Sequence, residues 1–222
     1  MQVSKNGSHD QSELVGSGKD EDFIDSVFDL TPEDVERKKT KKPKLLGIVC
    51  RRSDCKRELH CFDSSASKLK FSPGRCQACG VDLIDWDAVR VRDLRNVDLK
   101  FQFFQKEWIR HFFFHVPVTV RIEAYARQHG MRGLTSKLDS QLRRGTMLRF
   151  MPALDWKQTK MLDGTIVHWA RHATASCCRA CMKYWHNIPL EQELTTEDIE
   201  YFKELAKRYI ELRIPGLQSG PR

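Results

Sequence analysis

The sequence lacks every hydrophobic segment that would place the chain in or across a membrane. Its first residues contain no apolar core of a signal peptide, and no run of about 18 apolar residues occurs among the 222 residues. The eight cysteines suit no simple disulfide framework, because Cys177 and Cys178 are adjacent and other pairs have metal-ligand spacing. We therefore expect a soluble, cytoplasmic protein without disulfide bonds and without a membrane partner.

The sequence also lacks the common signatures of nucleotide and acyl chemistry. The patterns GxxxxGK[ST], GxGxxG, GxSxG and HExxH are all absent. Zinc deaminases of nucleobases need H-x-E before P-C-x-x-C, but His172 is followed by Ala and Thr, and Cys178 follows Cys177 instead of Pro. The sequence therefore excludes the enzyme classes that these motifs mark, so any chemistry must come from the cysteines and histidines.

Acidic residues are scarce in the second half of the chain. Residues 101–190 contain 14 Lys and Arg against 5 Asp and Glu, whereas residues 1–43 contain 7 against 10, and the net charge is +8. A cationic surface attracts phosphate polymers because binding releases counterions. We therefore predict DNA as the partner; the alternative is a basic surface that only keeps the protein soluble.

Composition divides the chain into four parts. Residues 1–43 are mostly polar and predict a disordered tail followed by a short helix from Thr31. Residues 44–98 alternate short apolar pieces with turn signals, which is typical of hairpins in a zinc-ribbon-like module. Residues 99–214 show helical spacing, and residues 215–222 form a tail. We therefore predict an α+β fold, in which the small module precedes a mainly helical His/Cys domain with a second metal site.

Four helical stretches are expected in the second domain. The aromatic spacing over residues 101–115 predicts one helix, and residues 118–129 predict another that ends at the following glycine. Leucine spacing predicts a basic helix from residue 136 onward. Thr195 and Asp198 have the spacing of a capping box, so a last helix is expected to follow them.

Two cysteine pairs in residues 44–98 have the spacing of zinc knuckles. These predicted ligands are Cys50 with Cys55, and Cys76 with Cys79. Gly80 suits the sharp turn that a knuckle needs. Four thiolates around one zinc leave no position for a substrate, so a structural role is predicted. His60 or Cys61 could replace either member of the first pair.

A second cluster combines histidines and cysteines. Its predicted zinc ligands are His172, Cys178, Cys181 and His186. Cys177 is then an extra thiol beside Arg171 and Arg179, whose positive charges lower the pKa of a thiol. We predict Cys177 as a nucleophile and His168 as a proton carrier. The alternatives are a second structural zinc with all positions filled, and an unreactive buried Cys177.

Basic residues of the second domain predict a phosphate-binding groove. The set comprises Lys137, Arg143, Arg144, Arg149, Lys157, Arg171 and Arg179. The alternative for the helical members is an amphipathic helix, with leucines facing the core and charges in solvent.

The string HATASCCRACMKYWHNIP, residues 172–189, resembles a small bacterial domain family of unknown function. With KQTKM at residues 157–161, the resemblance covers about residues 100–212, and it departs from the family pattern at Asn187, where glycine is expected. Because a four-cysteine module precedes this domain, the chain is also similar to the nitrile-hydrating proteins of bacterial 7-deazaguanine DNA-modification systems.

This second resemblance implies hydration of the nitrile of 7-cyano-7-deazaguanine in DNA to the amide, with zinc as cofactor and other proteins of such a system as partners. Either the Cys177 thiolate or a zinc-bound hydroxide could attack a nitrile carbon. The competing prediction is a non-catalytic zinc-dependent DNA-binding module. A magnesium-dependent nuclease is least favoured, because Asp155 and Asp163 are the only acids near the second cluster.

Overall fold

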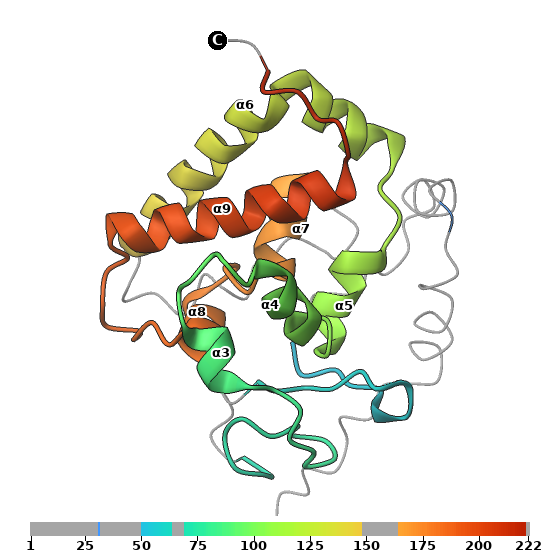
Figure 1. Ribbon diagram of the computed structural model, residues 1–222, viewed down its shortest axis with the longest axis vertical. Coiled ribbons are helices and arrows are strands. Elements are labelled where there is room, and N and C mark those ends of the chain that lie inside the picture. Colours follow the sequence, from blue (N-terminus) through green and yellow to red (C-terminus); the bar gives the residue numbers. More distant parts are fainter. Residues whose placement is uncertain (1–30, 32–49, 64–68, 148–163, 221–222) are drawn as a thin grey trace, which may run out of the picture.

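The computed structural model describes Thr31 and residues 50–63, 69–147 and 164–220 (Figure 1). The helices of these residues are the 3-10 helix η1 (Cys55–Arg57) and the α-helices α3 (Trp86–Arg90), α4 (Val97–Phe104), α5 (Trp108–His115), α6 (Val120–Met147), α7 (Ile166–Ala173), α8 (Arg179–His186) and α9 (Thr196–Arg213). None of them is both long and apolar enough to cross a membrane.

The described residues are mainly helical, as predicted for the second domain. They contain no β-strand, and the hairpins expected in residues 44–98 are reduced to isolated bridges, Asp54 with Leu59 and His60 with Glu107. Tight turns around the cysteines use the backbone groups that strands would need, as when Gly80 N–H donates to the Cys76 carbonyl oxygen. The predicted tail and short helix of residues 1–43 lie outside the described residues, except for Thr31.

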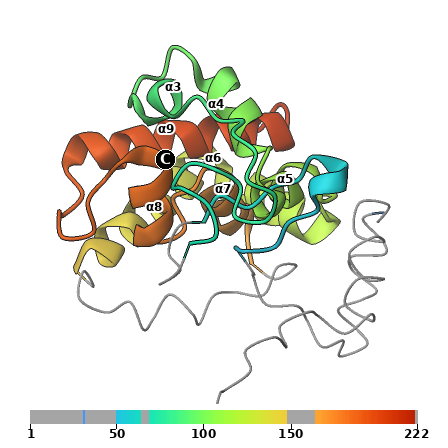
Figure 2. The same ribbon diagram turned by 90° about the horizontal axis from the view of Figure 1, so that it is seen from below.

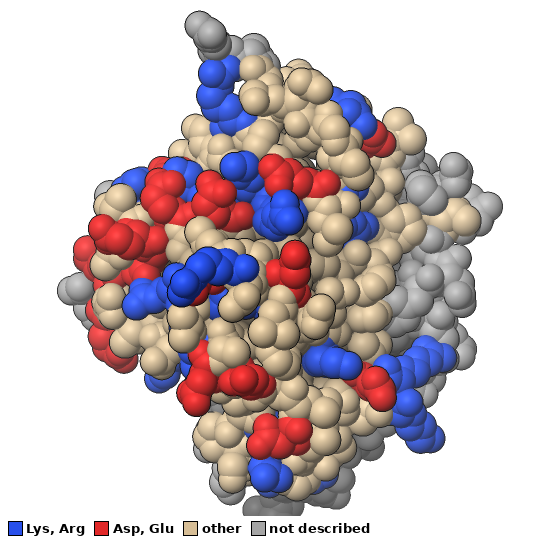
Figure 3. Space-filling view, in the orientation of Figure 1, with Lys and Arg blue, Asp and Glu red and all other residues tan. Residues whose placement is uncertain are grey.

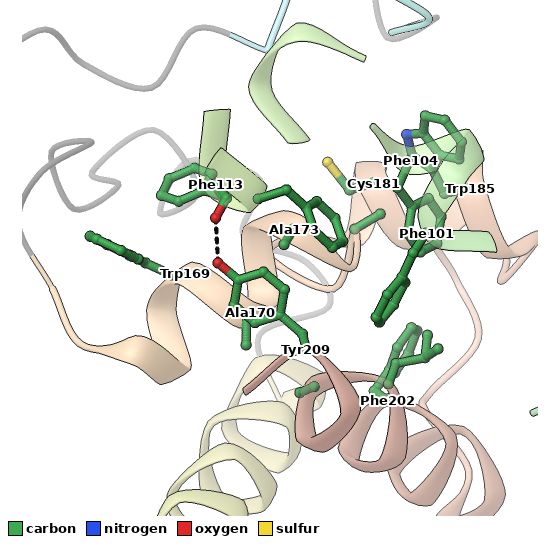
Figure 4. Packing of buried hydrophobic residues seen from close by; sticks show 14 of the residues in the cluster. Phe101, Phe104, Phe113, Trp169, Ala170, Ala173, Cys181, Trp185, Phe202 and Tyr209 are labelled. Carbon is green, nitrogen blue, oxygen red and sulfur yellow. Dashed lines mark hydrogen bonds between the residues drawn. The ribbon is translucent and has the colours of Figure 1, made fainter. Parts of the chain in front are cut away.

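One hydrophobic core joins the helices. Helix α9 packs against α6 and α7, α7 also packs against α5, and α3 contacts α4 and α8 (Figures 1 and 2). Phe113 of α5 and Ala170 of α7 lie beside Tyr209 of α9, whose hydroxyl donates to the Phe113 carbonyl oxygen (Figure 4). Phe62 and Ile84 belong to the same core. The segment before α3 therefore packs on the helical domain and has no separate core.

The helix predicted over residues 101–115 is divided into α4 and α5. His60 causes the division, because its backbone N–H donates to Lys106 O (2.8 Å) and its carbonyl oxygen accepts from Trp108 N–H (2.9 Å). These groups cannot also continue a helical hydrogen-bond ladder. The side chain of Glu107, at the division, is consequently buried.

Helix α6 changes direction at Gly130, where the sequence predicted a helix end. Gly130 has φ +60° and ψ 172°. The amide groups after this break are covered by the C-terminal segment, since Met131 N–H donates to Gln218 O (2.9 Å) and Arg132 N–H donates to Ser219 O (3.0 Å). An ideal Cβ on Gly130 would lie 2.3 Å from the Cα of Gly220. Both the backbone angle and this close approach require glycine.

The substitution Gly130→Ala is expected to lower the free energy of unfolding by about 3 kcal/mol, because it adds a clash with the C-terminal segment to the strain of a positive φ. Gly216→Ala is the control, since Gly216 also has a positive φ (+71°) but no atom lies within 4 Å of an added Cβ. Its expected cost is about 1 kcal/mol. Urea unfolding measures the free energy of unfolding of both variants. Equal losses in Gly130→Ala and Gly216→Ala would show that the C-terminal segment does not need glycine at position 130.

The capping box predicted before the last helix is confirmed. Thr195 Oγ1 accepts from Asp198 N–H (3.1 Å), and the Asp198 carboxylate accepts from Thr195 N–H (3.0 Å). The buried Asp198 also forms an ion pair with Arg92, which precedes α4. Helix α9 is thereby anchored at its beginning to the segment between α3 and α4.

Candidate metal centres

The first centre combines three cysteines with one histidine. Its members are Cys55, His60, Cys76 and Cys79, whose ligand atoms all lie within 4.8 Å of one another. The Sγ atoms of Cys55 and Cys76 are 3.8 Å apart, and Cys79 Sγ is 3.5 Å from His60 Nδ1. Three thiols and one imidazole form the donor set of a closed structural zinc site. His60 thus stands where Cys50 was predicted.

Local turns place the thiols of the first centre. Ala78 N–H donates to Cys76 Sγ (3.4 Å), and Gly80 has φ +81° in the turn after Cys79. Burial raises the pKa of the Cys76 thiol, but hydrogen bonds from backbone groups outweigh burial and bring this pKa down to about 6. Cys76 is therefore a thiolate at neutral pH, the form that binds zinc. The residues present fit a zinc ion.

The second centre contains three thiols. The Sγ atoms of Cys177, Cys178 and Cys181 lie within 4.8 Å of one another. Cys178 is the N-cap residue of α8, and its sulfur accepts from Cys181 N–H (3.5 Å). This geometry joins Cys177, predicted as an extra thiol, to the two cysteines predicted as ligands. Three thiolates suit a soft divalent cation such as zinc.

His186 and His172, both predicted as zinc ligands, have different hydrogen-bond surroundings. Both ring nitrogens of His186 have protein partners, because Nε2 is 2.9 Å from the Thr174 carbonyl oxygen and Nδ1 is 3.3 Å from the Tyr201 hydroxyl. His172 instead stacks on Phe113 with ring centroids 4.9 Å apart, and its buried Nδ1 has no hydrogen-bond partner. The structure does not bring His186 into the thiol cluster.

The two residues with predicted catalytic roles, Cys177 and His168, both lie near His172. His172 is one of the groups that lower the pKa of the Cys177 thiol, and the ring of His168 lies 4.6 Å from that of His172. Burial lowers the pKa of His168 to about 3, so His168 is neutral at pH 7 and its imidazole is a weak base. Hydrogen bonds with Cys178 and Cys181 hold the pKa of Cys177 well below its usual range. Cys177 is accordingly the thiol of this centre that ionises first.

The sequence analysis did not find Arg110, although this residue lies at the centre of the site. Arg110 is 1% exposed, and its Nη2 is 3.1 Å from Cys181 Sγ while its Nη1 is 3.8 Å from Cys177 Sγ. Arg110 Nε also lies 3.0 Å from the carboxylate of the buried Glu107. The available signal was a pair of opposite charges three residues apart within an aromatic stretch. Such a pair, once buried, supplies a fixed positive charge to the thiols.

Two residues of the predicted phosphate-binding set stabilise the loops around the second centre. Arg171 donates to the carbonyl oxygens of Ser176 (3.3 Å) and Cys177 (2.8 Å). Arg179 Nη2 donates to two carbonyl oxygens of the segment after α8, at 2.6 and 2.5 Å. These guanidinium groups therefore bind the chain's own backbone.

Three further members of that set lie exposed on α6. They are Lys137, Arg143 and Arg144, and the leucines between them, Leu138 and Leu142, are buried. This amphipathic pattern is the alternative that the sequence offered. Arg143 pairs with Asp139 at 2.7 Å. On the face drawn in Figure 3, acidic side chains lie among the basic ones, so that face carries no field of a single sign. Arg149 and Lys157 lie outside the described residues.

Comparison with known proteins gives a family for the second domain. No solved structure matches the chain. A family model described as a domain of unknown function (DUF4186) matches residues 98–211, just over half of the chain. The match begins in α4 and includes Arg110 and the second centre, whereas the first centre precedes it. The chain therefore belongs to the DUF4186 family.

Proposed function

We propose that this protein hydrates the nitrile of 7-cyano-7-deazaguanine in DNA to the amide, with Cys177 as the nucleophile. The observation that carries the proposal is the position of the Cys177 sulfur, which lies 3.8 Å from the guanidinium of the buried Arg110, with His172 among the groups that lower the pKa of this thiol. A thiolate beside an imidazole and a fixed cation is an activated nucleophile. The half-buried position of Cys177 leaves part of its side chain accessible.

The chemistry requires only one thiolate and proton carriers. The Cys177 thiolate adds to the nitrile carbon, and the nitrile nitrogen takes a proton, which gives a thioimidate. Water then adds to the same carbon, the carbon–sulfur bond breaks, and the amide leaves with the elements of one water. In this proposal His172 accepts the proton of the attacking water, and the neutral His168, whose ring lies 4.6 Å away, packs against the His172 ring. A zinc ion held by the neighbouring thiols would supply positive charge that favours the thiolate.

The decisive test is mass spectrometry of nucleosides from DNA that contains 7-cyano-7-deazaguanine, after incubation with the zinc-loaded protein. Wild-type protein is expected to add one water to the modified base. Cys177→Ala should lower the rate by on the order of 10⁴-fold or more, as loss of a covalent nucleophile does. Cys61→Ala is the control, because Cys61 is also buried but belongs to neither centre. Equal rates for wild type and Cys177→Ala would exclude Cys177 as the nucleophile.

A non-catalytic zinc-dependent DNA-binding module is the second candidate. The observation that favours it is the mutual proximity of the three thiols, which would allow Cys177 to serve as a metal ligand. No conversion by wild-type protein, together with binding of the same DNA, would support this candidate. In that case Cys177→Ala is expected to lower the zinc content of the protein.

A further inference from the structure

We infer that Cys50 binds the same metal ion as Cys178 and Cys181, so that a thiolate from the segment before the family domain completes the second centre. The ligand class is a soft divalent cation, with zinc as the natural occupant. This inference concerns metal binding alone and does not depend on the proposed nitrile chemistry.

The position of Cys50 is the first argument. Cys50 was predicted to pair with Cys55, but Cys50 is neither among the four groups of the first centre nor among the three thiols of the second that lie within 4.8 Å of one another. Instead, Cys50 lines one pocket together with Cys178 and Cys181. Its carbonyl oxygen is 3.7 Å from the sulfur of the buried Cys61. Cys50 thus lines the pocket beside the second centre, whereas Cys55 belongs to the first.

The charges around this pocket are the second argument. Besides the three thiols, the pocket is lined by the carboxyl groups of Asp63 and Glu107, and by the guanidinium of Arg110. Arg110 is already engaged by Glu107 at 3.0 Å and by Cys181 at 3.1 Å. A thiol loses its proton when it binds a metal ion, and the resulting thiolates beside these carboxyl groups need more positive charge than one arginine provides. A divalent cation at the thiols would supply it.

The number of cysteines in the chain agrees with two centres, the first of which is nested in sequence within the second. Seven of the eight cysteines then lie in a centre: Cys55, Cys76 and Cys79 in the first, and Cys50, Cys177, Cys178 and Cys181 in or beside the second. Cys61 remains as a buried thiol outside both. In the sequence, the ligands of the first centre lie between Cys50 and the other ligands of the second, so the second metal ion would tie the segment before α3 to helix α8. The fourth position of the second ion is open to Cys177 or to water.

The first experiment uses the wild-type full-length protein and needs no variant. The metal-free protein receives zinc in steps, the thiols are alkylated, and mass spectrometry measures the protection of each cysteine. We expect Cys50 to become protected at the same zinc equivalent as Cys178 and Cys181. Protection of Cys50 together with Cys55 and Cys76 would overturn the inference, as would no protection of Cys50 at saturating zinc.

The second experiment compares Cys50→Ser with Cys61→Ser. Cys50→Ser is expected to keep one zinc per chain and to weaken the other site by more than about 100-fold, which exceeds the effect typical of groups that only support a ligand. The absorption of the Co²⁺-substituted protein should lose thiolate charge-transfer intensity. Cys61→Ser should retain about two zinc ions per chain. Wild-type affinity at both sites in Cys50→Ser would refute the inference, and the nitrile assay plays no part in this result.

Discussion

Replacement of Arg110 by methionine is expected to lower the free energy of unfolding by about 3–5 kcal/mol, the cost of leaving a buried charge without its partner. Methionine keeps much of the volume, so the loss arises from charge and not from a cavity. Glu107, 1% exposed, would keep only the hydrogen bonds from Trp185 Nε1 (3.1 Å) and Phe62 N–H (3.4 Å). Denaturant unfolding at pH 8 measures the effect.

The pH dependence of this loss distinguishes charge from packing. Burial raises the pKa of Glu107 to about 7, although Arg110 opposes the rise. A carboxyl whose pKa is higher in the folded state than in the unfolded state makes stability fall as pH rises between the two pKa values. Without Arg110 this window extends to higher pH, so Arg110→Met should lose less stability at pH 5 than at pH 8.

A double variant provides the control for Arg110→Met. Adding Glu107→Gln removes the buried negative charge but keeps a side chain that can accept the hydrogen bond from Trp185. The double variant is expected to recover part of the stability at pH 8 and to lose the pH dependence assigned to Glu107. Equal stability of the single and double variants at pH 8 would show that Arg110 acts mainly on the thiols of the second centre.

Removal of zinc by a chelator is expected to unfold residues 50–63 and 69–82 locally, while α6 and α9 stay folded. The described residues of these two segments contain only the three-residue helix η1, and their other backbone hydrogen bonds belong to turns and isolated bridges that the metal ligands hold in place. At free zinc 1,000-fold above its Kd, the metal contributes about 4 kcal/mol to the stability of such a segment.

Hydrogen exchange measures this effect residue by residue. Amide protection in residues 50–63 and 69–82 should fall by about 10³-fold, which is the same free energy expressed as an equilibrium constant. The amides of α9 serve as the internal control. If they lose protection equally, the two parts unfold as one unit. If neither segment changes, zinc does not stabilise the first centre.

The fold was predictable where local chemistry decides the structure. The capping box at Thr195 and the break at Gly130 depend on residues next to each other in sequence, and both are present in the structure. The division between α4 and α5 was not predictable, because His60 causes it from more than 40 residues away. Backbone pairing between distant segments leaves no periodic signal in either of them.

The candidate sites show the same limit. Spacing identified Cys76 with Cys79 and Cys178 with Cys181, because two ligands three residues apart reach one ion through a local turn. The partners of each pair were harder to assign, since His60 and Cys50 are brought to their neighbours only by tertiary packing. The role of Arg110 was hidden for a related reason: a charged residue in an aromatic helix is interpreted as exposed until its buried counter-ion is known.

His60 contributes its ring to the first metal centre and its backbone to the junction of α4 and α5. Gene fusion could not readily exchange the segment before residue 98 for an unrelated one. A new leading segment would have to pair with Lys106 and Trp108 and to donate a hydrogen bond to Glu107, as Phe62 N–H now does. Members of the family with a different leading segment should therefore carry compensating changes at the junction of α4 and α5, even though it lies inside the shared domain.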